Sequence, residues 1–249
     1  MRSNRIPMTI QVAICCAGRS VVLASDTKVR SSEHTFTTRE PISTMVNRPK
    51  ISFSQRHGIA VAMAGDGPVG TDTAVELAAY LSALESIPNN LGPLLTKWGN
   101  DYFRRYHLEE KTSWRSPLCS LLVINPNTNY CQLWKLWINL ESADECSESF
   151  LVNGHSDNPA IFWLEYMKAG KKPPIEEASG IAIATIGIAA ELNPYGIGGL
   201  ELHEYWEGVW HHWSNEDIDH TEKFLAVAQD QIKKAVIGLG NRPVTPTQA

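Results

Sequence analysis

Polar and hydrophobic residues alternate along much of the first 70 positions in the manner of β-strands. Residues 9–14 alternate polar or small side chains with large apolar ones, and residues 21–24 resume a strand-like run after a turn at residues 17–18. A strand with one buried face has this period of two, so we predict a hairpin. Residues 50–53 and 58–64 predict a second hairpin, and the continuous apolar run of residues 58–64 is typical of a strand covered on both faces.

The segment between these two hairpins has no such pattern. Residues 31–49 are mostly polar, contain two prolines and show no sustained period. We therefore predict a long loop, and loops of this length in a domain often carry function or contact a partner.

The rest of the chain alternates between helical and strand-like patterns. Apolar residues recur at helical spacing from Asp72 to a break at residues 88–89, and again over residues 91–107. A third hairpin is predicted by residues 118–124 and 130–138, on either side of a turn at residues 126–129. Further expected elements are strand 150–152, helix 159–168, helix 175–192 (which contains two glycines), strand 200–206, and helix 215–239 begun by Ser214 or Asn215.

This order of elements indicates the fold class. Hairpins and helix pairs follow one another without βαβαβ alternation, which argues against a doubly wound parallel sheet and favours two antiparallel sheets flanked by helices. No repeat, low-complexity run or linker divides the chain, so residues 9–240 are predicted to form one domain. The Pro- and Thr-rich residues 241–249 are predicted to be a flexible tail.

Composition and charge exclude several classes of function. The chain has 249 residues, 43% of them hydrophobic, and a net charge of 22 − 27 = −5, which argues against a dedicated nucleic-acid-binding protein. The longest uncharged, apolar-rich stretch has 13 residues (178–190), whereas a membrane-spanning helix needs about 20. The first residues lack the apolar core of a secretion signal. The five cysteines fit neither a zinc site nor a disulfide framework, so we expect a cytoplasmic protein with reduced thiols.

The N-terminal segment narrows the function. It reads TIQVAICCAGRSVVLASDTK from Thr9 to Lys28, followed by Lys50-Ile51 and by Ala62-Met63-Ala64-Gly65. This ordered set resembles the proteasome β-subunit family and its simpler bacterial homologues, which are N-terminal-nucleophile (Ntn) hydrolases. The resemblance implies an α+β fold, the four-layer αββα sandwich, in which two antiparallel sheets lie between layers of helices.

The resemblance also implies a role for each residue of the motif. Thr9 would be the nucleophile, with its own α-amino group as base once it is the first residue of the chain; an unperturbed α-amine has a pKa of about 7.7–8.0. Lys50 would supply positive charge beside the hydroxyl, and Asp26 would hold and balance that lysine. The backbone N–H of Gly65 would donate to the oxyanion. Met63 would form the floor of the specificity pocket, which suggests apolar side chains in the substrate.

Thr9 is preceded by eight residues, so its amine is not free in this sequence. Family members with propeptides generally cut after a glycine, whereas the residue here is Met8, and methionine before a small residue is normally removed after translation. We therefore expect either that Met8 is the physiological initiator or that residues 1–8 are removed.

The downstream half departs from the family pattern. Where the family has Gly-Ser-Gly, this chain has Gly154-His155-Ser156, so His155 takes the place of the serine and Ser156 lies next to it. Where the family has Asp-x-x-Ser-Gly-Gly, Pro194 and Ile197 occupy the polar positions. The polar groups that support the threonine amine in the family are therefore replaced, and Asn193 or Ser156 could compensate.

The leading expectation is hydrolysis of peptide or amide bonds by Thr9, without metal or cofactor, inside a ring or helical array of like subunits. One alternative is a catalytically degenerate structural or gating subunit, which the blocked Thr9 and the replaced downstream polar residues favour and the retained Asp26 and Lys50 oppose. Taken position by position, Asp26 could instead cap a turn, Lys50 could end a strand in solvent, and Gly65 could be part of a turn. Another is a non-proteolytic amidase or transferase on the same scaffold. A phosphate-binding loop at residues 65–67 is disfavoured because no Gly-Lys-Ser/Thr follows.

Two further groups of residues are candidates for chemistry. His203, His211, His212 and His220, with Glu204 and Glu207, could suggest a metal site, but their spacing matches no metal motif and favours a strand pair with an aromatic packing face. Cys15 and Cys16 are adjacent in a predicted strand, so one thiol points to each face of the sheet, and we expect both to be buried structural thiols.

Overall fold

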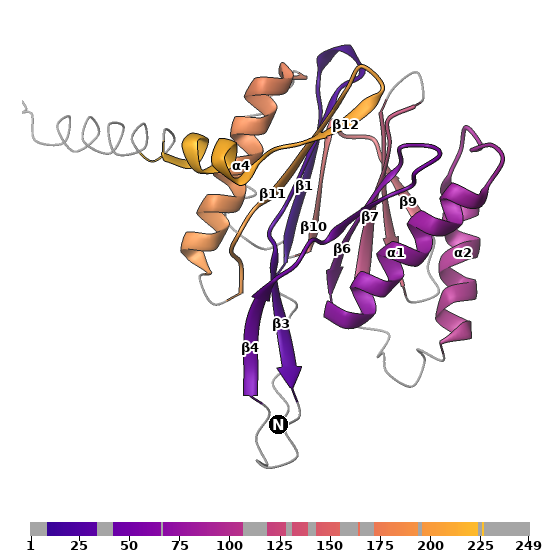
Figure 1. Ribbon diagram of the computed structural model, residues 1–249. Coiled ribbons are helices and arrows are strands. Elements are labelled where there is room, and N and C mark those ends of the chain that lie inside the picture. Colours follow the sequence, from indigo (N-terminus) through magenta and orange to yellow (C-terminus); the bar gives the residue numbers. More distant parts are fainter. Residues whose placement is uncertain are drawn as a thin grey trace, which may run out of the picture.

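The structure is a computed structural model that describes residues 9–33, 42–65, 67–106, 119–127, 131–138, 143–154, 164, 172–193, 196–223 and 226. Two five-stranded antiparallel sheets lie face to face, with helices on the outer face of each (Figure 1). The predicted α+β class and αββα layering are therefore confirmed. Within these ranges no helix combines the length and the apolar character needed to cross a membrane.

The first sheet has the strand order β10-β1-β2-β11-β12. Its strands are β10 (Phe150–Gly154), β1 (Ile10–Cys15), β2 (Val21–Ser25), β11 (Glu201–Trp206) and β12 (Val209–His212). The helix α4 (Ile175–Leu192), whose bounds match the prediction, covers the outer face of this sheet (Figure 1). An added Cβ at Gly180 or Gly187 of this helix would meet no atom within 4 Å, so packing does not require glycine at either position.

The second sheet has the order β5-β6-β7-β8-β9. Its strands are β5 (Ile51–Phe53), β6 (Ala60–Gly65), β7 (Cys119–Asn125), β8 (Gln132–Trp137) and β9 (Ala143–Cys146). The helices α1 (Gly67–Ala83) and α2 (Gly92–Arg105) cover its outer face (Figure 1). Strand β9 was not predicted, because this short, partly exposed edge strand has the sequence ADEC and no alternation of apolar residues.

Successive side chains of a strand point to opposite faces of its sheet. The buried apolar side chains therefore form three core layers, one between the sheets and one under the helices on each side. On β6, Val61 and Met63 pack against the α1/α2 side, whereas Ala60 and Ala62 face the other sheet. Small residues dominate this inner face of β6, and Ala13 of β1 belongs to the same inter-sheet cluster. The sheets can therefore approach closely, and the strand ends that carry the motif residues are brought together.

The predicted loop over residues 31–49 is wrong at residues 31–33 and 42–47, which form strands. Strands β3 (Lys28–Glu33) and β4 (Ile42–Asn47) pair in antiparallel register and form a two-stranded ribbon that extends away from the sandwich (Figure 1). Pairing of backbone N–H and C=O groups requires no alternation of apolar side chains, so this ribbon left no pattern in the sequence. Residues 34–41 lie outside the described residues.

The helix boundaries also differ from the predictions. Helix α1 begins at Gly67 rather than Asp72, with a proline at its second residue, where the missing N–H costs nothing. The closing helix is seen at residues 215–223 and begins after Ser214. The Ser214 hydroxyl accepts the N–H of Asp217 at 3.2 Å and donates to its carboxylate at 2.6 Å, which is a reciprocal cap. The predicted helix 159–168, apart from Leu164, and most of residues 224–249 lie outside the described residues, as do residues 1–8.

Gly154 allows β10 to end against the start of β1. It pairs with Ile10 and has φ 99°. A Cβ at this position would lie 2.0 Å from the carbonyl oxygen of Thr9. Both the positive φ and this close approach require glycine.

We expect Gly154→Ala to destabilise the protein more than Gly208→Ala does. Gly208 has a similar φ of 86° but no atom within 4 Å of an added Cβ, so it carries the conformational cost alone. The clash at Gly154 should add about 1–3 kcal/mol. Urea unfolding of the two variants measures this difference, and equal destabilisation would contradict the close packing of Gly154 on Thr9.

Candidate active site

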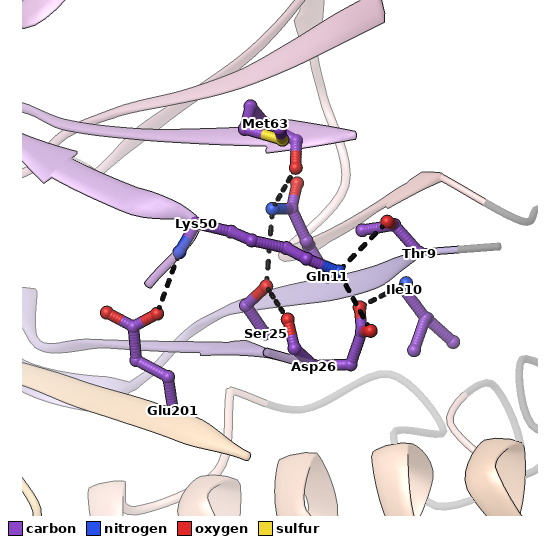
Figure 2. Close-up of polar contacts among 8 residues, drawn as sticks. All are labelled: Thr9, Ile10, Gln11, Ser25, Asp26, Lys50, Met63 and Glu201. Carbon is purple, nitrogen blue, oxygen red and sulfur yellow. Dashed lines mark hydrogen bonds and ion pairs between the residues drawn. The ribbon is translucent and has the colours of Figure 1, made fainter. Parts of the chain in front are cut away.

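Three residues that each flank a strand meet between the two sheets. Thr9 directly precedes β1, Asp26 directly follows β2, and Lys50 directly precedes β5. Their exposed fractions are 5%, 0% and 3%, respectively. The Lys50 ammonium donates to Thr9 Oγ1 at 3.0 Å and to Asp26 Oδ2 at 2.8 Å (Figure 2). The structure thus brings together the three residues that the sequence motif singled out.

Asp26 is held by the backbone as well as by Lys50. Its Oδ1 accepts the N–H of Ile10 at 3.0 Å, and its own N–H donates to the carbonyl of Ile10 at 3.1 Å. Both carboxylate oxygens therefore have partners. Because β1 pairs with β2, the Asp26 carboxylate is held at Ile10, the residue that directly follows Thr9.

Burial sets the electrostatics of this pair. It raises the pKa of the Asp26 carboxyl to about 6, although the charge of Lys50 and the hydrogen bond from it act in the opposite direction. Burial also lowers the pKa of the Lys50 ammonium, and the carboxylates of Asp26 and Glu201 oppose this fall. Asp26 is therefore ionised at neutral pH. A protonated Lys50 in this position would stabilise negative charge that develops on the Thr9 oxygen.

Met63 and Gly65 lie on β6, the strand next to β5. The Met63 N–H donates to the Lys50 carbonyl at 3.1 Å, so Met63 is tied directly to the residue that contacts Thr9. Its side chain is buried in the cluster on the α1/α2 side. Gly65 ends β6 opposite Cys119 with φ 140°, a conformation that other residues rarely adopt.

A row of polar side chains crosses the inner face of the first sheet beside the site. Asn153, Gln11, Ser25 and Glu201 are cross-strand neighbours on four adjacent strands, and all are buried. We call these four residues the inner polar row. The sequence pattern does not reveal this row, because polar positions that alternate with apolar ones predict an exposed face, whereas every residue of β1 is buried.

Hydrogen bonds of the inner polar row connect the two sheets. Gln11 Nε2 donates to the Met63 carbonyl at 2.7 Å (Figure 2), and Asn153 Nδ2 donates to Gln11 Oε1 at 2.8 Å. Asn153 also bonds Ser120 of β7, accepting from its hydroxyl at 2.6 Å and donating to its carbonyl at 3.2 Å. These bonds fix the strand of Thr9 relative to the strand of Gly65.

The structure describes only some of the downstream residues at which this chain departs from the family motif. Ile197 is buried on the α4 side of the first sheet, within its apolar cluster, and so supplies no polar group. The backbone carbonyl of Asn193, which follows α4, accepts the N–H groups of Gly196 and Ile197 at 3.1 and 3.0 Å. His155, Ser156 and Pro194 lie outside the described residues.

Three of the candidate histidines, His203, His211 and His212, pack against other rings, and His203 also contacts a carboxylate. His203 contacts the Glu201 carboxylate at 2.9 Å, its ring lies 4.6 Å from that of His212, and the ring of His211 stacks on Trp206 at 4.2 Å. In the part of the chain that the structure describes, no three His, Cys, Asp or Glu side chains are grouped as a metal would require. The predicted strand pair with aromatic packing is β11–β12.

The paired cysteines point to opposite faces of the first sheet, as predicted. Cys15 belongs to the cluster between the sheets and Cys16 to the cluster under α4. Burial raises the pKa of the Cys16 thiol to about 12, so it is not a thiolate at neutral pH. None of the five cysteines forms a disulfide in the part of the chain that the structure describes.

Comparison with solved structures finds the same fold. Anbu from Hyphomicrobium sp. strain MC1 superposes with a TM-score of 0.66 at 12% identity, over 96% of this chain and 100% of that one. Anbu (ancestral beta-subunit) from Yersinia bercovieri gives 0.65 at 14% identity over 96% and 100%, and a Gly-1 mutant of the Hyphomicrobium protein gives 0.64 at 12% over 97% and 100%. Comparison with models of known protein families and with curated proteins gives no match. Identities this low establish likeness of fold alone.

We expect the Asp26 carboxyl to titrate near pH 6, above the usual value of about 3.9 for an aspartate. Lys50→Met should raise this pKa further, because the Lys50 charge lowers it. Carbon NMR of aspartate-labelled protein measures both values, and Asp26→Asn identifies the resonance. Titration near pH 4 in the wild type would show that the Lys50 charge cancels the effect of burial, and would contradict the expected upward shift.

Gln11→Leu should cost about 1–3 kcal/mol of unfolding free energy, because it leaves the Met63 carbonyl and an Asn153 N–H without their partner. Gln55→Leu is the control, since the Gln55 side chain is exposed and should change stability by less than about 0.5 kcal/mol. Denaturant unfolding of both variants tests this, and equal costs would show that the Gln11 bonds add nothing.

Proposed function

We propose that this chain is a threonine-nucleophile hydrolase that cleaves peptide or amide bonds. The observation that carries the proposal is the shared Lys50 ammonium, which contacts both Thr9 Oγ1 and Asp26 in a buried site. Burying a charged group costs free energy. A threonine hydroxyl in an ordinary strand needs no charged partner, so the contact of the buried Lys50 ammonium with Thr9 Oγ1 indicates a role for that hydroxyl. The motif resemblance over residues 9–65 and the Anbu-like fold support the same proposal.

The reaction needs Thr9 to be the first residue of the working chain. We propose that residues 1–8 are absent from that form, through initiation at Met8 or through removal, and that residues 9–240 are the working domain. The Thr9 α-amine then takes the hydroxyl proton while Oγ1 bonds the substrate carbonyl carbon. When the substrate C–N bond breaks, that proton is transferred to the departing amine, and the acyl group remains on Thr9 Oγ1 as an ester. Water activated by the same amine hydrolyses the ester and restores the hydroxyl.

Each neighbouring residue has a part in this scheme. Lys50 offsets charge on the attacking oxygen, Asp26 holds Lys50, and the Gly65 N–H donates to the carbonyl oxygen as it becomes negative. One donor of this kind is typically worth about 3–4 kcal/mol. Met63 contributes to a pocket that takes an apolar substrate side chain.

We further propose that the chain works within a homo-oligomeric ring or helical array in the cytoplasm. Support comes from the likeness to a structure described as an ancestral beta-subunit. The cysteine spacing, which fits no disulfide framework, suits a reducing compartment. Such an array would shelter the sites from folded proteins.

A catalytically degenerate subunit is the second candidate, and the apolar burial of Ile197 favours it. In the family, the corresponding residue is polar and supports the threonine amine. This candidate predicts that the fold and the Lys50–Asp26 pair persist while Thr9 fails to react.

Covalent labelling separates the two candidates. We expect a peptide epoxyketone, which needs both a hydroxyl and a free α-amine, to add one equivalent to chains that start at Thr9 and none to chains that start at Met1. Thr9→Ser should retain labelling and Thr9→Ala should abolish it. Lys50→Met should slow it about 10²–10³-fold. Intact mass and peptide mapping give the readout, and a folded Thr9-started chain that stays unlabelled would establish the degenerate subunit.

A further inference from the structure

Glu201 is a carboxylate that the proposed reaction does not use, yet it is buried next to the site. It opens β11, belongs to the inner polar row and has an exposed fraction of 8%. Removing a carboxylate from water costs several kcal/mol unless partners replace the lost hydration. The burial of Glu201 therefore calls for an explanation in terms of a group that its negative charge stabilises.

The contacts of Glu201 lead to Lys50. Its Oε2 accepts the backbone N–H of Lys50 at 3.1 Å (Figure 2), and its Oε1 contacts His203 Nε2 at 2.9 Å. Because Glu201 is in the first sheet and Lys50 precedes an edge strand of the second, this bond crosses between the sheets. The Lys50 carbonyl already accepts the Met63 N–H. Both backbone polar groups of Lys50 are thus held while its side chain reaches Thr9.

The charged and titratable groups around this bond are few in the described ranges. Asp26, at the end of β2, faces the Lys50 ammonium, and Glu201, from β11, faces the Lys50 backbone. On the far side of Glu201 lies His203, and the ring of His212 lies beyond it, tilted by 34°. The negative charge of Glu201 raises the pKa of Lys50 and so opposes the effect of burial.

A neutral amide could also accept the Lys50 N–H, through a weaker hydrogen bond, and its burial would cost less. A glutamine at position 201 would therefore serve a purely structural role at lower cost. The carboxylate is explained if its charge acts on Lys50, whose ammonium must stay protonated in a site from which water is excluded.

We propose that Glu201 is a positioning residue for Lys50: it fixes the backbone from which the ammonium reaches Thr9, and its negative charge keeps that ammonium protonated. This role rests on the proposed function of Thr9 and Lys50, but its effect on Lys50 can be measured without any activity.

The experiment compares Glu201→Gln with Glu204→Gln. Glutamine at 201 keeps the acceptor and the shape but removes the charge. Glu204 lies on the same strand with its side chain on the α4 side, where it accepts from Ser179, so its replacement is the matched control. In protein labelled at lysine Cε, with Lys50→Met to assign the signal, Lys50 should titrate at lower pH in Glu201→Gln than in the wild type or in Glu204→Gln. An unchanged titration would overturn the proposal.

A second measurement links this result to the reaction. The rate of Thr9 labelling by the epoxyketone should fall at high pH as Lys50 loses its proton, and this fall should begin at lower pH in Glu201→Gln. A wild type that is never labelled refutes the proposed function, whereas the Lys50 titration still decides the role of Glu201. If Glu201→Gln does not fold, Glu201→Asp, which withdraws the charge by one methylene, should shift the titration in the same direction by less. No shift there would equally overturn the proposal.

Discussion

The structure depends on one buried ammonium. Lys50 bonds Thr9 and Asp26 together, and the three residues come from the ends of three strands in two different sheets. Burial of this charge is tolerable only because Asp26 is held at 2.8 Å and is itself fixed by the backbone of Ile10. The register of β1 with β2 and the distance between the sheets are therefore both constrained by the same pair.

The inner polar row shows how the sandwich meets this constraint. Apolar contacts are not directional, so an entirely apolar inner face would not set how one sheet is positioned on the other. The amides of Gln11 and Asn153 instead bond particular atoms of the opposite sheet, at the end where Thr9 and Gly65 lie. Toward the middle of the sandwich the same strands carry small and apolar residues such as Ala13 and Ala62. Hydrogen bonds at the site thus set the relative position of the two sheets, and apolar burial elsewhere stabilises their packing.

Much of the fold could be predicted because its strands and helices carry strong periodic patterns. The bounds of α4 and the hairpins of β1–β2, β5–β6 and β7–β8 follow from the spacing of apolar residues. Strands β3, β4 and β9 could not be predicted this way. Strands β3 and β4 pair with each other in a separate two-stranded sheet and show no apolar alternation in the sequence, and β9 is a short, partly exposed edge strand. The meeting of Thr9, Asp26 and Lys50 was anticipated from the ordered motif and not from any spacing in the chain.

The sequence alone determined the fold class, the central hairpins and the identity of the three residues that meet at Lys50. Only the tertiary structure decided that both faces of β1 are buried, and with it the roles of Gln11, Asn153 and Glu201. The physical reason is that alternation reports two faces of a strand but cannot tell solvent from a second sheet. A polar residue marks an exposed face in the first case and a paired, buried group in the second.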